Sequence, residues 1–272
     1  MPLPEGFQFS QSNLQAYVDC KRFFYLRYLL KTAWPAVKTE PALENEKFER
    51  MGLAFHRLAQ QHLLGIDAAR LSSAAEANQI GGEQLADWWN IFLGYVQKLP
   101  TALPPDAAVQ RLPEVILTAP ARLGRAGSFP YRLFAKYDAL VILASPTEER
   151  RAAILDWKTG RRKTKRSKLE KKLQTRVYPL LFVLAGNQFN RGKPFQPDQV
   201  EMLYWFTAQP DQPERFMYNQ QKFDEDCEFL ADLIREIEAC SGENLPPVGE
   251  GDNCAWCVYR SFCDQGTRAG EM

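Results

Sequence analysis

The sequence predicts an α/β fold in which a mixed central sheet is flanked by helices and preceded by a helical region. In the first third of the chain, apolar residues recur at the three- and four-residue spacing of amphipathic helices. The middle of the chain instead alternates apolar and polar residues with the period of strands. With 45% apolar and 12% aromatic residues, 272 residues can bury the core that such a fold needs.

Three helices are predicted in the N-terminal region, over residues 10–30, 44–64 and 74–99. The first carries Cys20 near its middle, and the second carries His56 beside its apolar face. Gly81 and Gly82 mark a point where the third helix would split.

The rest of the chain predicts a meander of three strands, then a helix, a strand and a long helix. The strands are expected at residues 114–118, 131–143, 152–157 and 200–206, and the helices at 169–185 and 223–240. Pro179 should kink or restart the first of these helices. We expect a helical region (1–110), a core (111–245) and a C-terminal segment (246–272) that form one structural unit.

The charge of the chain is balanced overall but unevenly distributed. The formal charge of +1 carries no information about partners, whereas residues 161–172 contain eight basic residues and one acid. This run predicts either a stripe that binds a phosphate backbone or a solvated helix face. No apolar run is long enough for a membrane span and no signal sequence is evident, so we expect a cytoplasmic protein.

Asp156 and Lys158 form an Asp-x-Lys pair that lies on one face of its predicted strand. Phosphodiester hydrolysis uses such a pair, because carboxylates hold Mg²⁺ or Mn²⁺ and a lysine steadies the attacking water or the phosphate. Asp138 lies on the preceding strand, where an antiparallel neighbour would bring it beside Asp156. The alternative is a surface ion pair, but both acids interrupt strongly apolar strands, where an unpaired charge is costly.

Three further side chains are candidates for the same site. His56 is a possible third metal ligand, although a lone helix histidine more often has a core or surface role. Gln174 and Tyr178 are four residues apart, hence adjacent on one helical face, and would position the lysine or the substrate strand.

The cysteine spacing predicts a four-thiolate site. Cys254, Cys257 and Cys263 form a C-x2-C-x5-C run, and Cys20 is the natural fourth ligand. The two remaining cysteines, Cys227 and Cys240, fall in a helical pattern and are expected to be buried or neutral thiols. Four thiolates suit either Zn²⁺ or an iron–sulfur cluster, although zinc ribbons more often pair two CxxC motifs.

The motifs GLAFH, YDAL, LDWKTG and QTRVY, in this order around the predicted core, resemble the RecB-like branch of the PD-(D/E)XK superfamily. The resemblance implies a restriction-endonuclease-like core and an active site whose motif residues correspond to His56, Asp138, Asp156, Lys158, Gln174 and Tyr178. His56, Asp138 and Asp156 would hold the metal, and Glu114 would be at most a supporting acid. Pro179 and the long basic run depart from the usual pattern.

The cysteines resemble those of iron–sulfur nucleases, namely AddB-type helicase-nuclease subunits and CRISPR-associated RecB-like exonucleases. In these proteins one N-terminal cysteine, followed by a basic and aromatic run, pairs with three C-terminal ones. The resemblance implies a 4Fe-4S cluster on Cys20, Cys254, Cys257 and Cys263 that joins the two ends of the fold.

Together with these motifs, the resemblance to the two nuclease groups implies a metal-dependent deoxyribonuclease, an exonuclease or end-processing enzyme that prefers single-stranded DNA. Its setting would be repair or recombination, or CRISPR spacer acquisition, with a protein partner possible in either complex. Residues 161–172 and three N-terminal cations (Lys21, Arg22, Arg27) would bind phosphates, and Phe23, Tyr25 or Tyr28 would stack on bases unless they belong to the core. The alternatives are a catalytically silent iron–sulfur DNA-binding module and a zinc-stabilised subunit of a larger complex.

Overall fold

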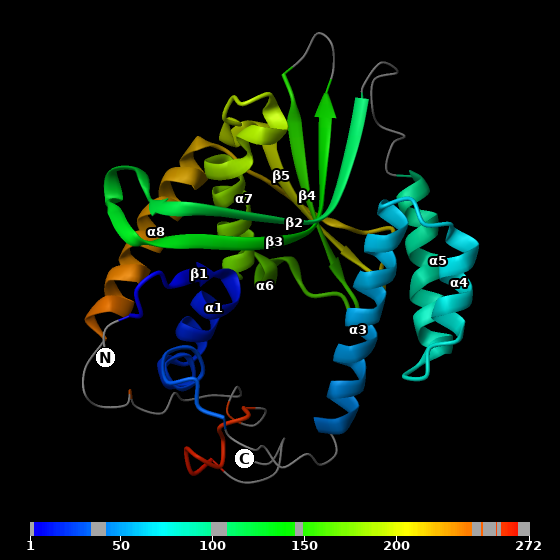
Figure 1. The fold of residues 1–272 in the computed structure, drawn as a ribbon, viewed down its shortest axis with the longest axis horizontal. Helices are drawn as coiled ribbons and strands as arrows, with labels where there is room; N and C mark the ends of the chain where they lie inside the picture. The colour runs from blue at the N-terminus through cyan, green and yellow to red at the C-terminus, as the bar shows by residue number, and fades with distance from the viewer. Residues whose placement is uncertain are drawn as a thin grey trace.

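The computed structural model describes residues 3–33, 42–98, 108–144, 149–240, 246, 254 and 257–265. Within them a six-stranded mixed sheet separates two groups of helices, which confirms the predicted α/β class (Figure 1). One face of the sheet is covered by α1 (Gln11–Asp19), α7 (Leu173–Ala185) and α8 (Gln220–Ala239). The other is covered by α3 (Ala42–Leu63) and α5 (Gly82–Lys98), and α4 (Ala68–Glu76) packs on these two helices. In these ranges no helix has both the length and the apolarity required to cross a membrane.

The sheet is built around the predicted meander. Its strands are β1 (Gln8–Ser10), β2 (Ala108–Arg122), β3 (Ser128–Ala144), β4 (Arg151–Lys158), β5 (Val200–Phe206) and β6 (Glu214–Met217). β2, β3 and β4 pair antiparallel, β5 joins β4 in parallel, and β1 and β6 pair with β3 and β5. The sequence did not predict β1 and β6, because three or four residues are too few to establish an alternating pattern.

Alternation along the strands supplies two separate cores. Leu140 and Ile154 point toward α7 and α8, whereas Leu155 and Trp157 point toward α3 and α5. All four side chains are at most 3% exposed. The strands are therefore fixed from both faces, which holds the polar residues at their ends in a defined place.

The single helix predicted for residues 10–30 is wrong. The backbone becomes extended at Cys20 (φ −161°, ψ 109°), so α1 ends at Asp19 and a new helix, α2 (Lys21–Phe24), begins. The Cys20 sulfur accepts the backbone N–H of Phe23 at 3.4 Å and caps α2. Cys20 therefore lies at a break between helices rather than in mid-helix.

α2 continues directly into a π-helical turn, η1 (Tyr25–Leu29). Tyr25 is only 8% exposed, so it belongs to the core and is not available to stack on a base. The rings of Phe24 and Tyr28 pack against each other with centroids 5.5 Å apart. The aromatic run of this segment is mainly structural.

The other helix predictions are largely confirmed. The predicted third helix is divided into α4 and α5, and Gly81 adopts φ +153° just before α5 begins. α7 passes through Pro179 without ending, although the sequence predicted a kink or a restart. α7 is almost wholly buried, and this packing offsets the hydrogen bond that proline removes. The predicted third helix was expected to end at residue 99, which lies outside the described residues, as does most of the segment 246–272.

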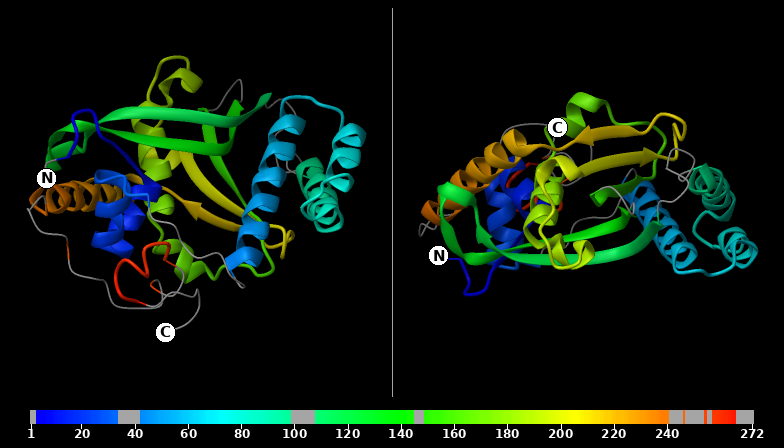
Figure 2. Two further views of the ribbon diagram at one scale, coloured as in Figure 1. Left: turned by 60° about the horizontal axis from the view of Figure 1, so that its bottom comes forward. Right: turned by 90° about the horizontal axis from the view of Figure 1, so that it is seen from above.

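The two ends of the described chain meet. The Tyr259 hydroxyl donates to the backbone carbonyl of Thr32 at 2.9 Å, and its ring contacts the Phe23 ring edge-on at 5.6 Å. Figure 2 shows this C-terminal segment, drawn in red, beside the blue N-terminal helices.

Candidate functional site

Three acidic residues form a row across the meander. β2 and β3 pair at Pro113–Ala139 and at Val115–Tyr137, so Glu114 lies opposite Asp138. The register of β3 with β4, which pairs Ala139 with Leu155, puts Asp156 on the other side of Asp138. One acid from each of three neighbouring strands therefore lies at the same level of the sheet.

Glu114 has an unusual backbone for a strand residue. Its φ is +54°, in the left-handed region that L-residues other than glycine rarely adopt. Its carboxylate forms an ion pair with Lys136. A strained conformation at a non-glycine residue often marks a functional position, because the surrounding structure must hold it there.

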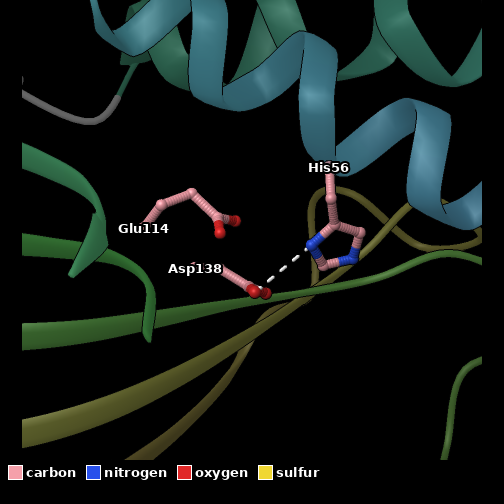
Figure 3. Close-up of side chains that lie close together, drawn as sticks. All are labelled: His56, Glu114 and Asp138. Carbon is pink, nitrogen blue, oxygen red and sulfur yellow. Dashed lines mark ion pairs between the residues drawn. The ribbon is translucent and has the colours of Figure 1, made fainter. Parts of the chain in front are cut away.

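His56 reaches the row of acids from α3. Its Nδ1 atom lies 3.2 Å from Oδ1 of Asp138 (Figure 3). One possible ligand atom from each of His56, Glu114 and Asp138 can be chosen so that all three lie within 4.8 Å of one another. Figure 3 shows the three side chains converging from α3, β2 and β3. One nitrogen and several carboxylate oxygens are a suitable ligand set for Mn²⁺ or Mg²⁺.

Asp138 also ends the ladder between β3 and β4. Its Oδ2 atom accepts the backbone N–H of Trp157 at 2.8 Å, beyond the last ladder pair at Ala139–Leu155. The hydrogen bond fixes the carboxylate with one oxygen toward β4 and the other toward His56.

Asp156, Lys158 and Gln174 form a second, directly adjoining group. Nζ of Lys158 lies 2.6 Å from Oδ2 of Asp156 and donates to Oε1 of Gln174 at 3.0 Å. The Gln174 amide nitrogen donates to Oδ1 of Asp156. Gln174 thus contacts both members of the Asp-x-Lys pair. The ammonium group of Lys158 also lies over the ring of Tyr204 on β5, with Nζ 5.4 Å from the ring centroid.

The two groups influence each other electrostatically. Burial raises the pKa of Asp156, against the opposing charge of Lys158, and the charge of Asp138 raises it further. Burial alone would lower the pKa of His56, but the hydrogen bond to Asp138 and the charges of Asp138 and Asp156 raise it above its usual value. A concentration of negative charge this strong is what a divalent cation would neutralise.

Tyr178 lies one turn after Gln174 on α7, behind the row of acids. Its hydroxyl donates to the backbone carbonyl of Lys136 at 2.8 Å. Burial, together with the charges of Asp156, Asp138 and Glu114, raises its pKa well above the usual value, so it stays a neutral phenol. Its hydroxyl is thus tied to the β3 backbone two residues before Asp138, and its side chain also hydrogen-bonds with Gln174, which contacts Lys158.

The basic run is only partly free to bind a polyanion. Lys163 and Arg166 are both paired with Glu214 on β6, at 2.5 and 3.1 Å. The Arg161 guanidinium lies over the Phe48 ring of α3 at 4.4 Å. The five other cations of the run are exposed and form no ion pair with another described residue. These are Arg162, Lys165, Lys168, Lys171 and Lys172.

Of the N-terminal cations, Lys21 is already paired with Glu236 at 2.5 Å, and Arg27 lies over the Phe23 ring at 5.8 Å. The ring of Phe23 contacts both Arg27 and Tyr259. These groups hold the N-terminal helices together, so the surface expected to bind phosphates here is smaller than the sequence indicated.

Four cysteines, one near the start of the chain and three near its end, line one pocket. They are Cys20, Cys254, Cys257 and Cys263, and Phe23, Leu26, Tyr259 and Arg260 complete its wall. Burial raises the pKa of the Cys257 thiol, and the neighbouring cysteines raise it further. No three of these four sulfur atoms, all of them in the described part of the chain, lie within 4.8 Å of one another.

The two other cysteines have different surroundings. Cys227 is a buried residue of α8, and burial raises its pKa to about 12, so it is a neutral thiol. Cys240 accepts a hydrogen bond from the Tyr17 hydroxyl at 3.0 Å, at the end of α8.

Sequence reasoning gave too little weight to Glu114 and missed two other residues near the site. Glu114 was assigned at most a supporting role, because nothing in its sequence context reveals a positive φ. Glu214, the partner of two cations of the basic run, belongs to the unpredicted strand β6. Tyr204 reads as an ordinary core residue of an apolar strand.

Comparison with known proteins adds one strong match. A sequence model of the family described as "PD-(D/E)XK nuclease superfamily" matches residues 8–264. No curated protein matches the chain. Among solved structures, the crystal structure of SSO0001 aligns over 79% of this chain and 96% of that chain, with 12% sequence identity and a TM-score of 0.35. A TM-score this low carries no structural argument.

Proposed function

Because the chain belongs to the PD-(D/E)XK nuclease superfamily, we propose that it is a divalent-metal-dependent deoxyribonuclease that cuts phosphodiester bonds beside Asp156 and Lys158. The observation that carries this proposal is the junction of two groups, His56–Glu114–Asp138 and Asp156–Lys158–Gln174, at one end of the meander. Nucleic acid as the substrate class follows from the family. DNA, single strands and attack at or near an end are part of the proposal.

The donor set fits a hard divalent cation. His56, Glu114 and Asp138, which the structure brings together, would hold it. We propose Asp156 as a further ligand, although its two oxygens contact Lys158 and Gln174 in the structure and it is not one of the three grouped side chains. When bound, the ion would activate water and offset the charge that develops on the phosphate. Because one donor is an imidazole, we expect Mn²⁺ to be favoured over Mg²⁺.

The protein side chains supply the rest of the chemistry. Lys158 carries a positive charge on a side chain that Asp156 and Gln174 hold from two sides, so it can stabilise a negatively charged phosphate without reorganising. Asp138 is held by the backbone N–H of Trp157, which fixes its free oxygen toward His56.

We propose that DNA enters along the exposed cations that follow Lys158. Five basic side chains between residues 162 and 172 have no ion pair in the described structure, and a phosphate backbone would bind there by releasing counterions. A preference for single strands would follow if only a flexible strand can reach Asp156, which is 3% exposed. Repair or recombination, and CRISPR spacer acquisition, are the settings we propose, since both process DNA ends.

We further propose that Cys20, Cys254, Cys257 and Cys263 bind a 4Fe-4S cluster. The donor set consists of four thiols that line one pocket. A single Zn²⁺ would require neighbouring sulfur atoms about 3.8 Å apart, given Zn–S bonds of about 2.3 Å. No three of the four sulfur atoms lie that close in the described structure. The preference for a cluster over zinc rests on the motif, since zinc ribbons more often pair two CxxC motifs and this run has one. Such a cluster would act structurally, by holding α2 and the C-terminal segment together.

The nuclease proposal is tested with end-labelled single- and double-stranded DNA in Mg²⁺ or Mn²⁺, using anaerobically purified protein. Wild type should cut, Asp156→Ala should not, and Asp87→Ala, which removes an exposed acid on α5, should cut like wild type. Wild type that binds DNA but cuts with neither metal would instead support a catalytically silent binding module. A brown protein containing iron is expected, and a colourless zinc-loaded one would overturn the cluster proposal.

A further inference from the structure

Gln174 is one of the two side chains that hold Lys158, and it lies in the first turn of α7. It contacts both Asp156 and Lys158, and it is only 6% exposed. Its position therefore depends on how α7 begins. A small rotation of the first turn would move the glutamine amide away from the lysine.

The beginning of α7 lacks the usual local cap. The N-cap residue, Lys172, makes no capping hydrogen bond with its side chain. The first backbone N–H groups of a helix have no partner within the helix and need an acceptor from elsewhere. Here the acceptor comes from α1, since Oε1 of Gln15 accepts the N–H of Leu173 at 3.1 Å.

Gln15 is itself held in place. Its amide nitrogen donates to Oδ1 of Asp19, one turn later on α1, at 2.9 Å. α1 begins with a capping box between Ser10 and Asn13, and its Tyr17 hydroxyl donates to Oε1 of Glu236 on α8 at 3.3 Å. A well-anchored helix thus presents a fixed acceptor to the start of α7.

We propose that Gln15 is a positioning residue for the cleavage reaction, acting by fixing the first turn of α7 and, through Gln174, the ammonium group of Lys158. This inference rests on the proposed nuclease function. It assigns to α1 a part in the reaction, although Gln15 itself bonds to Asp19 and to the Leu173 backbone rather than to the acids or the lysine of the site.

The test compares Gln15→Met, which keeps the length of the side chain but removes the acceptor, with Gln11→Met on the same helix. Gln11 is a matched control, since within the described residues its side chain hydrogen-bonds to the neighbouring Ser12 and to no part of α7. A third variant, Gln15→Glu combined with Asp19→Asn, keeps an acceptor for the Leu173 N–H and restores a donor one turn later on α1, so that two carboxylates do not face each other.

Two readouts are needed. Amide hydrogen exchange should become faster at Leu173 and Gln174 in Gln15→Met and stay unchanged in Gln11→Met. The kcat for cleavage should fall about tenfold in Gln15→Met with little change in KM, because ground-state binding of DNA is not affected. Gln15→Glu combined with Asp19→Asn should recover most of the loss.

A double variant distinguishes positioning from a general loss of stability. Once Gln174→Met has removed the amide, Gln15→Met should cost little further activity, since both act through the same contact. The inference would be overturned if the two substitutions multiplied each other's loss of activity in the double variant. It would also be overturned if Gln15→Met showed unchanged amide hydrogen exchange at Leu173 or the kcat of wild type. None of these results would affect the nuclease proposal. A wild type that does not cut would overturn the proposed function, and the positioning role with it.

Discussion

Replacing Glu114 by glycine and by alanine separates the cost of its backbone conformation from its role in the site. Glu114 has φ +54° within β2, opposite Asp138. The left-handed conformation costs a non-glycine residue about 1–2 kcal/mol. Glycine avoids this cost but gains entropy in the unfolded chain worth about 0.4–1 kcal/mol.

Both replacements lose the ion pair with Lys136 equally, so that contribution cancels. Glu114→Gly should therefore be more stable than Glu114→Ala by about 0.5–1 kcal/mol. For a chain of this size the difference corresponds to about 2 °C in Tm, which calorimetry or a thermal melt followed by circular dichroism resolves. If Glu114→Ala melts at the same temperature as Glu114→Gly, or above it, the strain argument is wrong.

The activity of the same two variants tests the chemical role of Glu114. We expect cleavage to fall about 10–100-fold in both, because each lacks the carboxylate beside His56 and Asp138. Wild-type cleavage by the glycine variant would show that the site works without this acid.

The remaining predictions concern other groups of the site. Asp156→Asn should lower cleavage by about 100-fold or more while the circular dichroism spectrum stays that of the wild type, and retained cleavage would remove Asp156 from the chemistry. His56→Asn should lower the ratio of the Mn²⁺-supported rate to the Mg²⁺-supported rate, because the imidazole ligand is lost, and an unchanged ratio would contradict its role as a ligand. The hydrogen bond from Lys163, followed by that from Arg166, lowers the pKa of Glu214. The stability that Glu214 contributes is thus present above the ordinary pKa of glutamate and is lost as the pH falls through its lowered value, so the Tm difference between wild type and Glu214→Gln should shrink in acid. A difference that does not change with pH would contradict this linkage.

Much of the fold follows from local pattern. Strands β2 to β5 and helices α3, α7 and α8 carry strong periodicity, and two neighbouring strands in register bring Asp138 close to Asp156. The four cysteines could be grouped by their spacing and by resemblance, and the structure brings them to one pocket.

What the sequence did not reveal depends on single contacts rather than on pattern. The break at Cys20 is stabilised by its sulfur capping α2, within a segment whose residues otherwise favour one continuous helix. The positive φ of Glu114 is imposed by its tertiary surroundings and leaves no sign in the sequence. The cap that Gln15 gives to α7 spans 158 residues, and no local rule predicts such a contact.

The central claim, that a divalent ion binds between α3 and the row of acids, is tested most directly by titrating Mn²⁺ into DNA-free protein. The signal of the free ion in electron paramagnetic resonance reports binding, with Asp138→Asn as the comparison. We predict that Asp138→Asn weakens Mn²⁺ binding by about tenfold or more relative to wild type. The reason is that Asp138 lies between the other two acids of the row and contacts both His56 and the backbone of β4. Equal binding by the two proteins would contradict the account.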